Sequence, residues 1–150
     1  MYKKILVPLD GSPVAEGVLP HAQNLAYSEG AELVLLNVAA NAAADFLFAD
    51  PALAERSVSE QEERSKAYMT QVEDRLRAEG VQVSTLLREG AVAQVILDTA
   101  EEIQADVIAM STHGRTGAAR WLLGSVADRV VRNSKVPVLL IRAPASRAGK

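Results

Sequence analysis

The sequence predicts an α/β fold, a doubly wound sheet of five parallel strands in one domain. Five short apolar runs are hydrophobic almost throughout, which is typical of strands that helices cover on both faces. Helical patterns separate these runs, so strands and helices alternate along the chain. The length of 150 residues suits one domain with a core of ordinary size.

The predicted strands are 4–9, 32–38, 81–87, 106–110 and 136–142. The first helical stripe follows Ser12 and Pro13, a cap residue and a proline at the first helical position. Pro20 lies inside this stripe and predicts a bend at the second turn. Gly30 stands where a helix-ending glycine belongs.

Between the second and third strands we expect a mobile connection over the carboxyl edge of the sheet, residues 39–55, followed by a charge-rich helix. Ser57 with Glu60 fits a capping box at the start of that helix, and Gly80 marks its end. Two further helical stripes follow, and Ser125 is predicted to cap the last helix, 126–133. The domain is expected to span 1–143, with a disordered tail over 144–150.

Composition excludes several classes of function. The net charge of −3 gives no electrostatic footprint for nucleic acid. Without cysteine the chain has no disulfide, thiolate zinc site or cysteine nucleophile, and two histidines exclude a histidine-rich metal site. The first apolar run is too short for a signal peptide, and no run approaches the ~20 residues of a membrane span. We therefore expect a cytoplasmic protein with neither nucleic-acid nor membrane partners.

The predicted site lies at two strand ends. Ligands of a doubly wound sheet bind outside the carboxyl ends of the strands, where the strand order reverses. The most polar, glycine-containing strand ends are 8–12 and 110–114. Gly114 and Gly124-Ser125 bracket a loop before the last helix, and such a junction offers backbone N–H groups and a helix dipole to a phosphate. Alternatively, these glycines only turn the loop and Ser125 is an ordinary cap; the residues alone favour neither.

Gly114, the nine residues RTGAARWLL and then Gly124-Ser125, together with the opening ILVPLDGS, resemble the universal stress protein family over nearly the whole chain. Ser111 stands where the family motif has its first glycine. The resemblance implies a Rossmann-like sheet of strand order 3-2-1-4-5 that binds ATP. It also implies a homodimer through the last strand, from Val136 to Arg142.

The resemblance also implies a role for each site residue. Asp10 would contact the base or ribose, with Pro8 and Leu9 lining that end, while Val38 and Met110 would meet the adenine. The expected phosphate contacts are Gly114, Gly124, Ser125 and Val126, with Ser111 and His113 lining or flanking the pocket. Any Mg²⁺ would arrive with the nucleotide and be held mainly by phosphates.

The predicted function is regulatory ATP binding in a stress response, without efficient catalysis. The sequence has neither a Walker lysine loop nor paired carboxylates near the phosphate loop. Two alternatives stay open: a dimeric interaction module that binds no nucleotide, and a slow ATP hydrolase, since positioning plus a metal contributes some rate.

Overall fold

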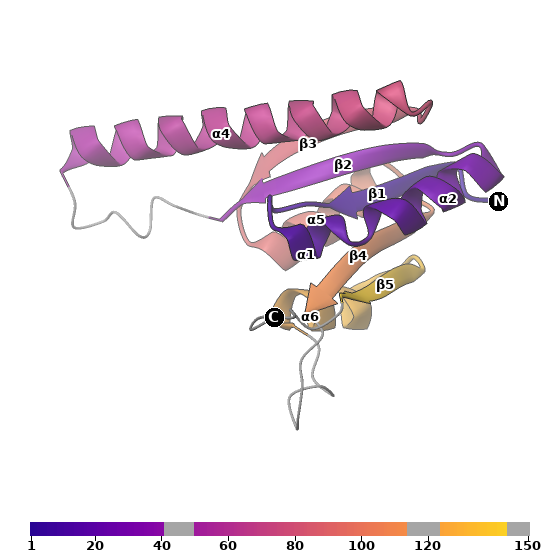
Figure 1. Ribbon diagram of the computed structural model, residues 1–150. Coiled ribbons are helices and arrows are strands. Elements are labelled where there is room, and N and C mark those ends of the chain that lie inside the picture. The colour runs from indigo at the N-terminus through magenta and orange to yellow at the C-terminus, as the bar shows by residue number, and fades with distance from the viewer. Residues whose placement is uncertain (41–49, 114–123, 144–150) are drawn as a thin grey trace, which may run out of the picture.

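The computed structural model describes residues 1–40, 50–113 and 124–143. Its five parallel strands are β1 (Lys4–Pro8), β2 (Glu32–Ala39), β3 (Val83–Glu89), β4 (Val107–His113) and β5 (Val138–Ala143). The strand order is β3-β2-β1-β4-β5, which confirms the predicted doubly wound topology (Figure 1). The order reverses between β1 and β4, so the connections after these two strands leave on opposite faces of the sheet.

Helices cover both faces of the sheet. The helices are α1 (Pro13–Glu16), α2 (Leu19–Glu29), α4 (Pro51–Ala78), α5 (Val92–Glu102) and α6 (Ser125–Asn133). Ile5 and Val7 of β1 pack into one core cluster with residues of α2 and α4, whereas Leu6 packs into a second cluster with α5 and α6. Neighbouring residues of a strand point to opposite faces of the sheet, so a strand that helices cover on both faces is apolar at successive positions. This double coverage explains the uninterrupted hydrophobic runs.

The first helical stripe forms two helices. Ser12 Oγ accepts a hydrogen bond from the N–H of Ala15 (3.2 Å) and caps α1, as predicted. The helix ends at Glu16, and α2 begins at Leu19 with Pro20 in its first turn. Because proline has no N–H to offer the carbonyl four residues earlier, a continuous helix is interrupted here. The predicted bend is therefore confirmed, as a break just before the proline.

The predicted start of the long helix is wrong. Helix α4 begins at Pro51, and the side chain of Asp50 caps it by accepting the N–H of Ala52 (3.0 Å). Asp50 and Pro51 supply the same pair of signals as Ser12 and Pro13, and they precede Ser57. Ser57 and Glu60 consequently lie inside the helix, and the connection is shorter than predicted. Its residues 41–49, like the tail 144–150, lie outside the described residues.

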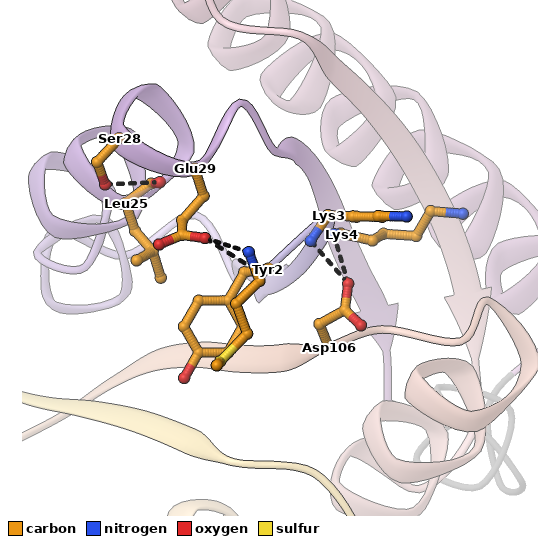
Figure 2. Close-up of polar contacts among 8 residues, drawn as sticks. Tyr2, Lys3, Lys4, Leu25, Ser28, Glu29 and Asp106 are labelled. Atoms are coloured by element: carbon orange, nitrogen blue, oxygen red, sulfur yellow. Dashed lines mark hydrogen bonds and ion pairs between the residues drawn. The ribbon is translucent and has the colours of Figure 1, made fainter.

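The amino edge of the sheet is held by two carboxylates (Figure 2). Asp106, just before β4, accepts the backbone N–H groups of Lys3 (2.8 Å) and Lys4 (2.9 Å) through one oxygen. Glu29, at the end of α2, accepts the N–H of Tyr2 (3.1 Å). Both contacts fix the start of β1 against its neighbours. Within the described ranges, no helix has the length and hydropathy that a membrane span requires.

Candidate functional site

A cavity of about 400 Å³ opens at the carboxyl ends of β1 and β4, where the strand order reverses. Its volume lies in the range of small-molecule sites. Nine predicted site residues line it: Pro8, Leu9, Asp10, Val38, Met110, Ser111, Gly124, Ser125 and Val126. These residues come from the ends of β1, β2 and β4 and from the start of α6. The structure thus brings together residues that are far apart in sequence.

One end of the cavity is apolar. Val38 at the end of β2 and Met110 of β4 line it beside Leu36, Val92 and Ile96. Met110, Leu36 and Ile96 are also members of the core cluster under α5 and α6, so this wall is anchored in the core. Leu36, Val92 and Ile96 were not predicted as site residues, because an apolar residue in a covered strand or helix reads simply as core. A flat, apolar ring system suits such a slot.

The other end is the start of α6. Gly124 is the N-cap residue in an extended conformation (φ −60°, ψ 155°), and no side chain of the described residues caps the helix. Asp128 is the first residue whose N–H bonds within the helix, to the carbonyl of Gly124 (2.8 Å). The N–H groups of Ser125, Val126 and Ala127 therefore lack intrahelical acceptors, and all three residues line the cavity. Unsatisfied donors at the positive end of a helix dipole form an anion site.

Two details of this end differ from the prediction. Ser125 is the first helical residue rather than the cap, because Gly124 already takes the extended conformation of a cap residue. In addition, the N–H of Gly124 donates to the hydroxyl of Thr112 (3.2 Å). Thr112 is buried, lines the cavity and was missed by the sequence analysis, although it stands between Ser111 and His113 in the same strand end. The donors available to a ligand thus begin one residue later than predicted.

The turn after β1 is built by Asp10. Its Oδ1 accepts the N–H of Ser12 (2.8 Å), while Gly11 takes a positive φ of +89° that favours glycine. Below the turn, Asn37 of β2 donates to the carbonyl of Leu9 (3.0 Å) from a buried position. Asp10 therefore caps the turn, and it also lines the cavity, where it was predicted to contact the base or ribose. The two roles are compatible because the carboxylate has a second oxygen.

Helix α4 contributes two polar side chains near Glu16 of α1, those of Arg75 and Tyr68. Arg75 donates to Glu16 of α1 (3.1 Å). Burial, followed by the carboxylates of Glu16 and Asp10, raises the pKa of Tyr68 above its ordinary value. Tyr68 therefore stays a neutral phenol, and it adds no negative charge to the two carboxylates near it.

The lining residues carry no positive charge. None of those that the structure describes is lysine, arginine or histidine, and Asp10 is the one carboxylate among them. Among the described lining residues, attraction for an anion therefore comes from backbone N–H groups and the helix dipole. His113 ends β4 opposite Ala143, and only its backbone is described. Gly114 lies outside the described residues.

Comparison with known proteins agrees with this architecture. The model of the universal stress protein family matches residues 1–142. Universal stress protein MJ0531 of Methanocaldococcus jannaschii is 38% identical over 144 residues, which cover 96% of this chain and 84% of that protein. The solved structure of hypothetical protein MJ0577, from the same organism, has a TM-score of 0.82 and 30% identity, covering 95% of this chain and 97% of that one.

The fold also matches a structure that contains a nucleotide. The universal stress protein from Archaeoglobus fulgidus in complex with dAMP has a TM-score of 0.68 and 22% identity, and the match covers 94% of this chain and 98% of that one. At this identity the likeness concerns the fold. With the whole-length family match and the 38% identical relative, the cavity at the reversal of strand order completes the assignment: this chain belongs to the universal stress protein family.

Proposed function

We propose that this chain binds ATP as a regulatory protein of the stress response. The adenine occupies the apolar end of the cavity, between Val38 and Met110, and the phosphates reach the start of α6. One observation carries the proposal: three N–H groups at the start of α6, without acceptors among the described residues, lie on the same cavity as a group of apolar side chains. An adenine nucleotide has these two chemistries, a planar apolar base and an anion, joined by a sugar.

A related structure supports the class of ligand. The Archaeoglobus fulgidus protein, which has the same fold, is described in complex with dAMP, an adenine nucleotide. The number of phosphates is part of our proposal. Mg²⁺ prefers oxygen ligands and keeps several waters when it accompanies a nucleotide. Asp10 is the carboxylate at hand, and one of its oxygens is engaged by Ser12, so we assign the ion mainly to phosphate oxygens.

We assign a binding role rather than efficient catalysis. The lining offers one carboxylate and four hydroxyl-bearing residues, Ser12, Ser111, Thr112 and Ser125. The hydroxyls of Ser12 and Thr112 accept hydrogen bonds from backbone N–H groups, and within the described residues none of the four bonds to a basic side chain. The described lining therefore provides no nucleophile with an adjacent base. Ligand-dependent regulation requires that the nucleotide binds two conformations unequally, and contacts to the strand ends and to α6 supply such differential affinity.

The variant Ser125→Pro tests the phosphate site. Proline is favoured at the first helical position, and Gly124 already has the extended conformation that a residue before proline prefers. The change therefore removes one N–H donor and one hydroxyl without disturbing the helix. A hydrogen bond to a charged group contributes about 2 kcal/mol, so we expect ATP affinity to fall by roughly 30-fold.

Isothermal titration with ATP measures this loss, and thermal melting verifies that the variant is folded. Ser125→Ala is the matched control, since it removes only the hydroxyl and retains the N–H. Equal ATP affinity in the wild type and Ser125→Pro would refute the phosphate assignment. If the wild type binds no adenine nucleotide, the dimeric interaction module becomes the better description. Release of phosphate during the titration would favour the slow hydrolase.

We also propose a homodimer through the last strand. In the described residues β5 pairs only with β4, which leaves its other edge open. This strand carries three half-buried apolar residues, Leu139, Leu140 and Ile141. An open apolar edge invites pairing, and a twofold axis closes it with a second copy. Sedimentation equilibrium at micromolar concentration tests this, and a monomer contradicts it.

A further inference from the structure

Ser111 carries a buried hydroxyl that the fold does not use. Its Oγ is buried and has no hydrogen-bond partner in the part of the chain that the structure describes. The neighbouring hydroxyl of Thr112, in contrast, accepts the N–H of Gly124. A buried polar group without a partner destabilises a protein, so a hydroxyl at this position calls for a reason other than stability.

The hydroxyl lies against Gly17, which follows α1. A Cβ placed on Gly17 would lie 3.4 Å from Ser111 Oγ and 3.1 Å from the carbonyl of Val14. The hydroxyl thus lies beside Gly17 without bonding to it. Rotation about the Cα–Cβ bond moves a serine hydroxyl among three staggered positions at low cost. Ser111 itself lines the cavity, so such a rotation brings the hydroxyl within reach of a ligand.

The order of residues along β4 indicates which part of the ligand lies beside Ser111. Met110 belongs to the apolar end of the cavity, whereas Thr112 bonds to Gly124 at the start of α6. Ser111 stands between these two residues in the strand, but its side chain points to the opposite face of the sheet, toward Gly17 beside α1. Helix α1 lines the same cavity, so we place the sugar that joins base and phosphates over this strand end, where the cavity is lined from both faces. This step rests on the proposed function.

We propose that the hydroxyl of Ser111 turns from Gly17 into the cavity and bonds a hydroxyl of the ribose, so that the site prefers ribonucleotides to deoxyribonucleotides. A site that pairs a buried polar group with a substrate hydroxyl discriminates against the analogue that lacks it, because the protein group is then left unpaired. Ser111 is thus a specificity-determining residue of the cavity. Its hydroxyl gains in the complex a partner that it lacks among the described residues of the free protein.

The test measures the affinities of ATP, 2′-deoxy-ATP and 3′-deoxy-ATP for the wild type and for Ser111→Ala. One neutral hydrogen bond corresponds to about a five-fold change in affinity. We expect the wild type to bind ATP about five-fold more tightly than one of the deoxy analogues. We expect Ser111→Ala to bind both nucleotides of that pair equally. The analogue that shows the difference identifies the hydroxyl.

Ser125→Ala is the matched control, because this serine lines the same cavity at the phosphate end. We expect it to change the affinities of ATP and the deoxy analogues by the same factor. Thermal melting of the free proteins adds a second readout. If the hydroxyl served only to stabilise the fold, its removal would lower the Tm. Removing an unpaired buried hydroxyl is expected to raise the Tm of Ser111→Ala while its ATP affinity falls.

Three results overturn the inference while the proposed function stands. Equal binding of ATP and both deoxy analogues by the wild type shows that no ribose hydroxyl is read. A uniform loss for all three nucleotides in Ser111→Ala assigns the hydroxyl to another role, such as a phosphate contact. If the wild type binds ATP more tightly than a deoxy analogue and Ser111→Ala keeps this difference, another residue makes the contact. If none of the nucleotides binds the wild type, the proposed function fails and takes the inference with it.

Discussion

Asp106 provides a test of how the sheet is held together at the reversal of strand order. Strands β1 and β4 are joined by two register pairs, Ile5 with Val107 and Leu6 with Ile108. Asp106 extends this junction by accepting the N–H groups of Lys3 and Lys4 on the same carboxylate oxygen. Figure 2 shows both contacts converging on that atom. We expect its removal to weaken the junction that positions the cavity at the opposite edge.

Two substitutions separate the hydrogen bonds from the charge. Both bonds use one oxygen, so Asp106→Asn can keep them as neutral bonds, whereas Asp106→Ala loses them. The site is partly exposed, so we use the lower part of the range for charged hydrogen bonds, about 2 kcal/mol for the alanine variant. Neutral bonds are roughly half as strong, which gives about 1 kcal/mol for the asparagine variant. For a domain of 150 residues, each kcal/mol lowers the Tm by about 2–4 °C.

The pH dependence follows from the same contacts. Hydrogen bonds from the N–H groups of Lys3 and Lys4 lower the pKa of Asp106 in the folded protein. A lowered folded-state pKa stabilises the fold above the unfolded value, which is about 4, and this stabilisation is lost as the pH falls through the folded-state pKa. The wild type should therefore be more stable than Asp106→Asn at pH 6, and the difference should disappear toward pH 2.

Urea unfolding of the wild type and both variants at pH 6 and at a series of lower pH values measures these differences. Asp106→Ala is the control for loss of both the charge and the acceptor. A wild type and an Asp106→Asn variant of equal stability at pH 6 would refute the assigned role of the charge. So would a difference between them that does not change with pH.

Three further predictions concern the fold. Gln104, after α5, has a positive φ of 56°, a backbone conformation that is strained for a residue with a side chain. Gln104→Gly should therefore raise the free energy of unfolding in urea by about 1 kcal/mol, and an unchanged urea midpoint contradicts this. Asn37→Ala leaves the buried carbonyl of Leu9 unpaired, so we expect a loss of about 2 kcal/mol, and a stability equal to wild type would show that water replaces the amide. Asp50→Ala removes the cap of α4 and should cost about 1 kcal/mol, measured by thermal melting with Ser57→Ala as the control that leaves the cap intact.

The helix-start signals in the sequence located the start of α1 but not that of α4. The Ser12 and Pro13 pair identified the start of α1, because the other cap residue nearby, Asp10, is followed by a glycine rather than by a helix former. The start of α4 was misplaced because this stretch offers two cap residues, Asp50 and Ser57, and the helix begins at the first of them. Periodicity cannot separate them, since most residues of the first turns of α4 are exposed and carry no core stripe.

The chain by itself determined the fold class, because covered parallel strands must be apolar throughout and the connections between them must be helical. The strand order came from the resemblance to the universal stress protein family, and the structure agrees with it. The chain also determined which strand ends are polar. Only the tertiary structure decided that Leu36, Val92 and Ile96 form a wall of the cavity, that Thr112 engages the N–H of Gly124, and that Ser111 rests unpaired against Gly17. The physical reason is that a pattern shows which side chains are buried or polar, whereas a hydrogen bond or a cavity depends on where separate elements meet.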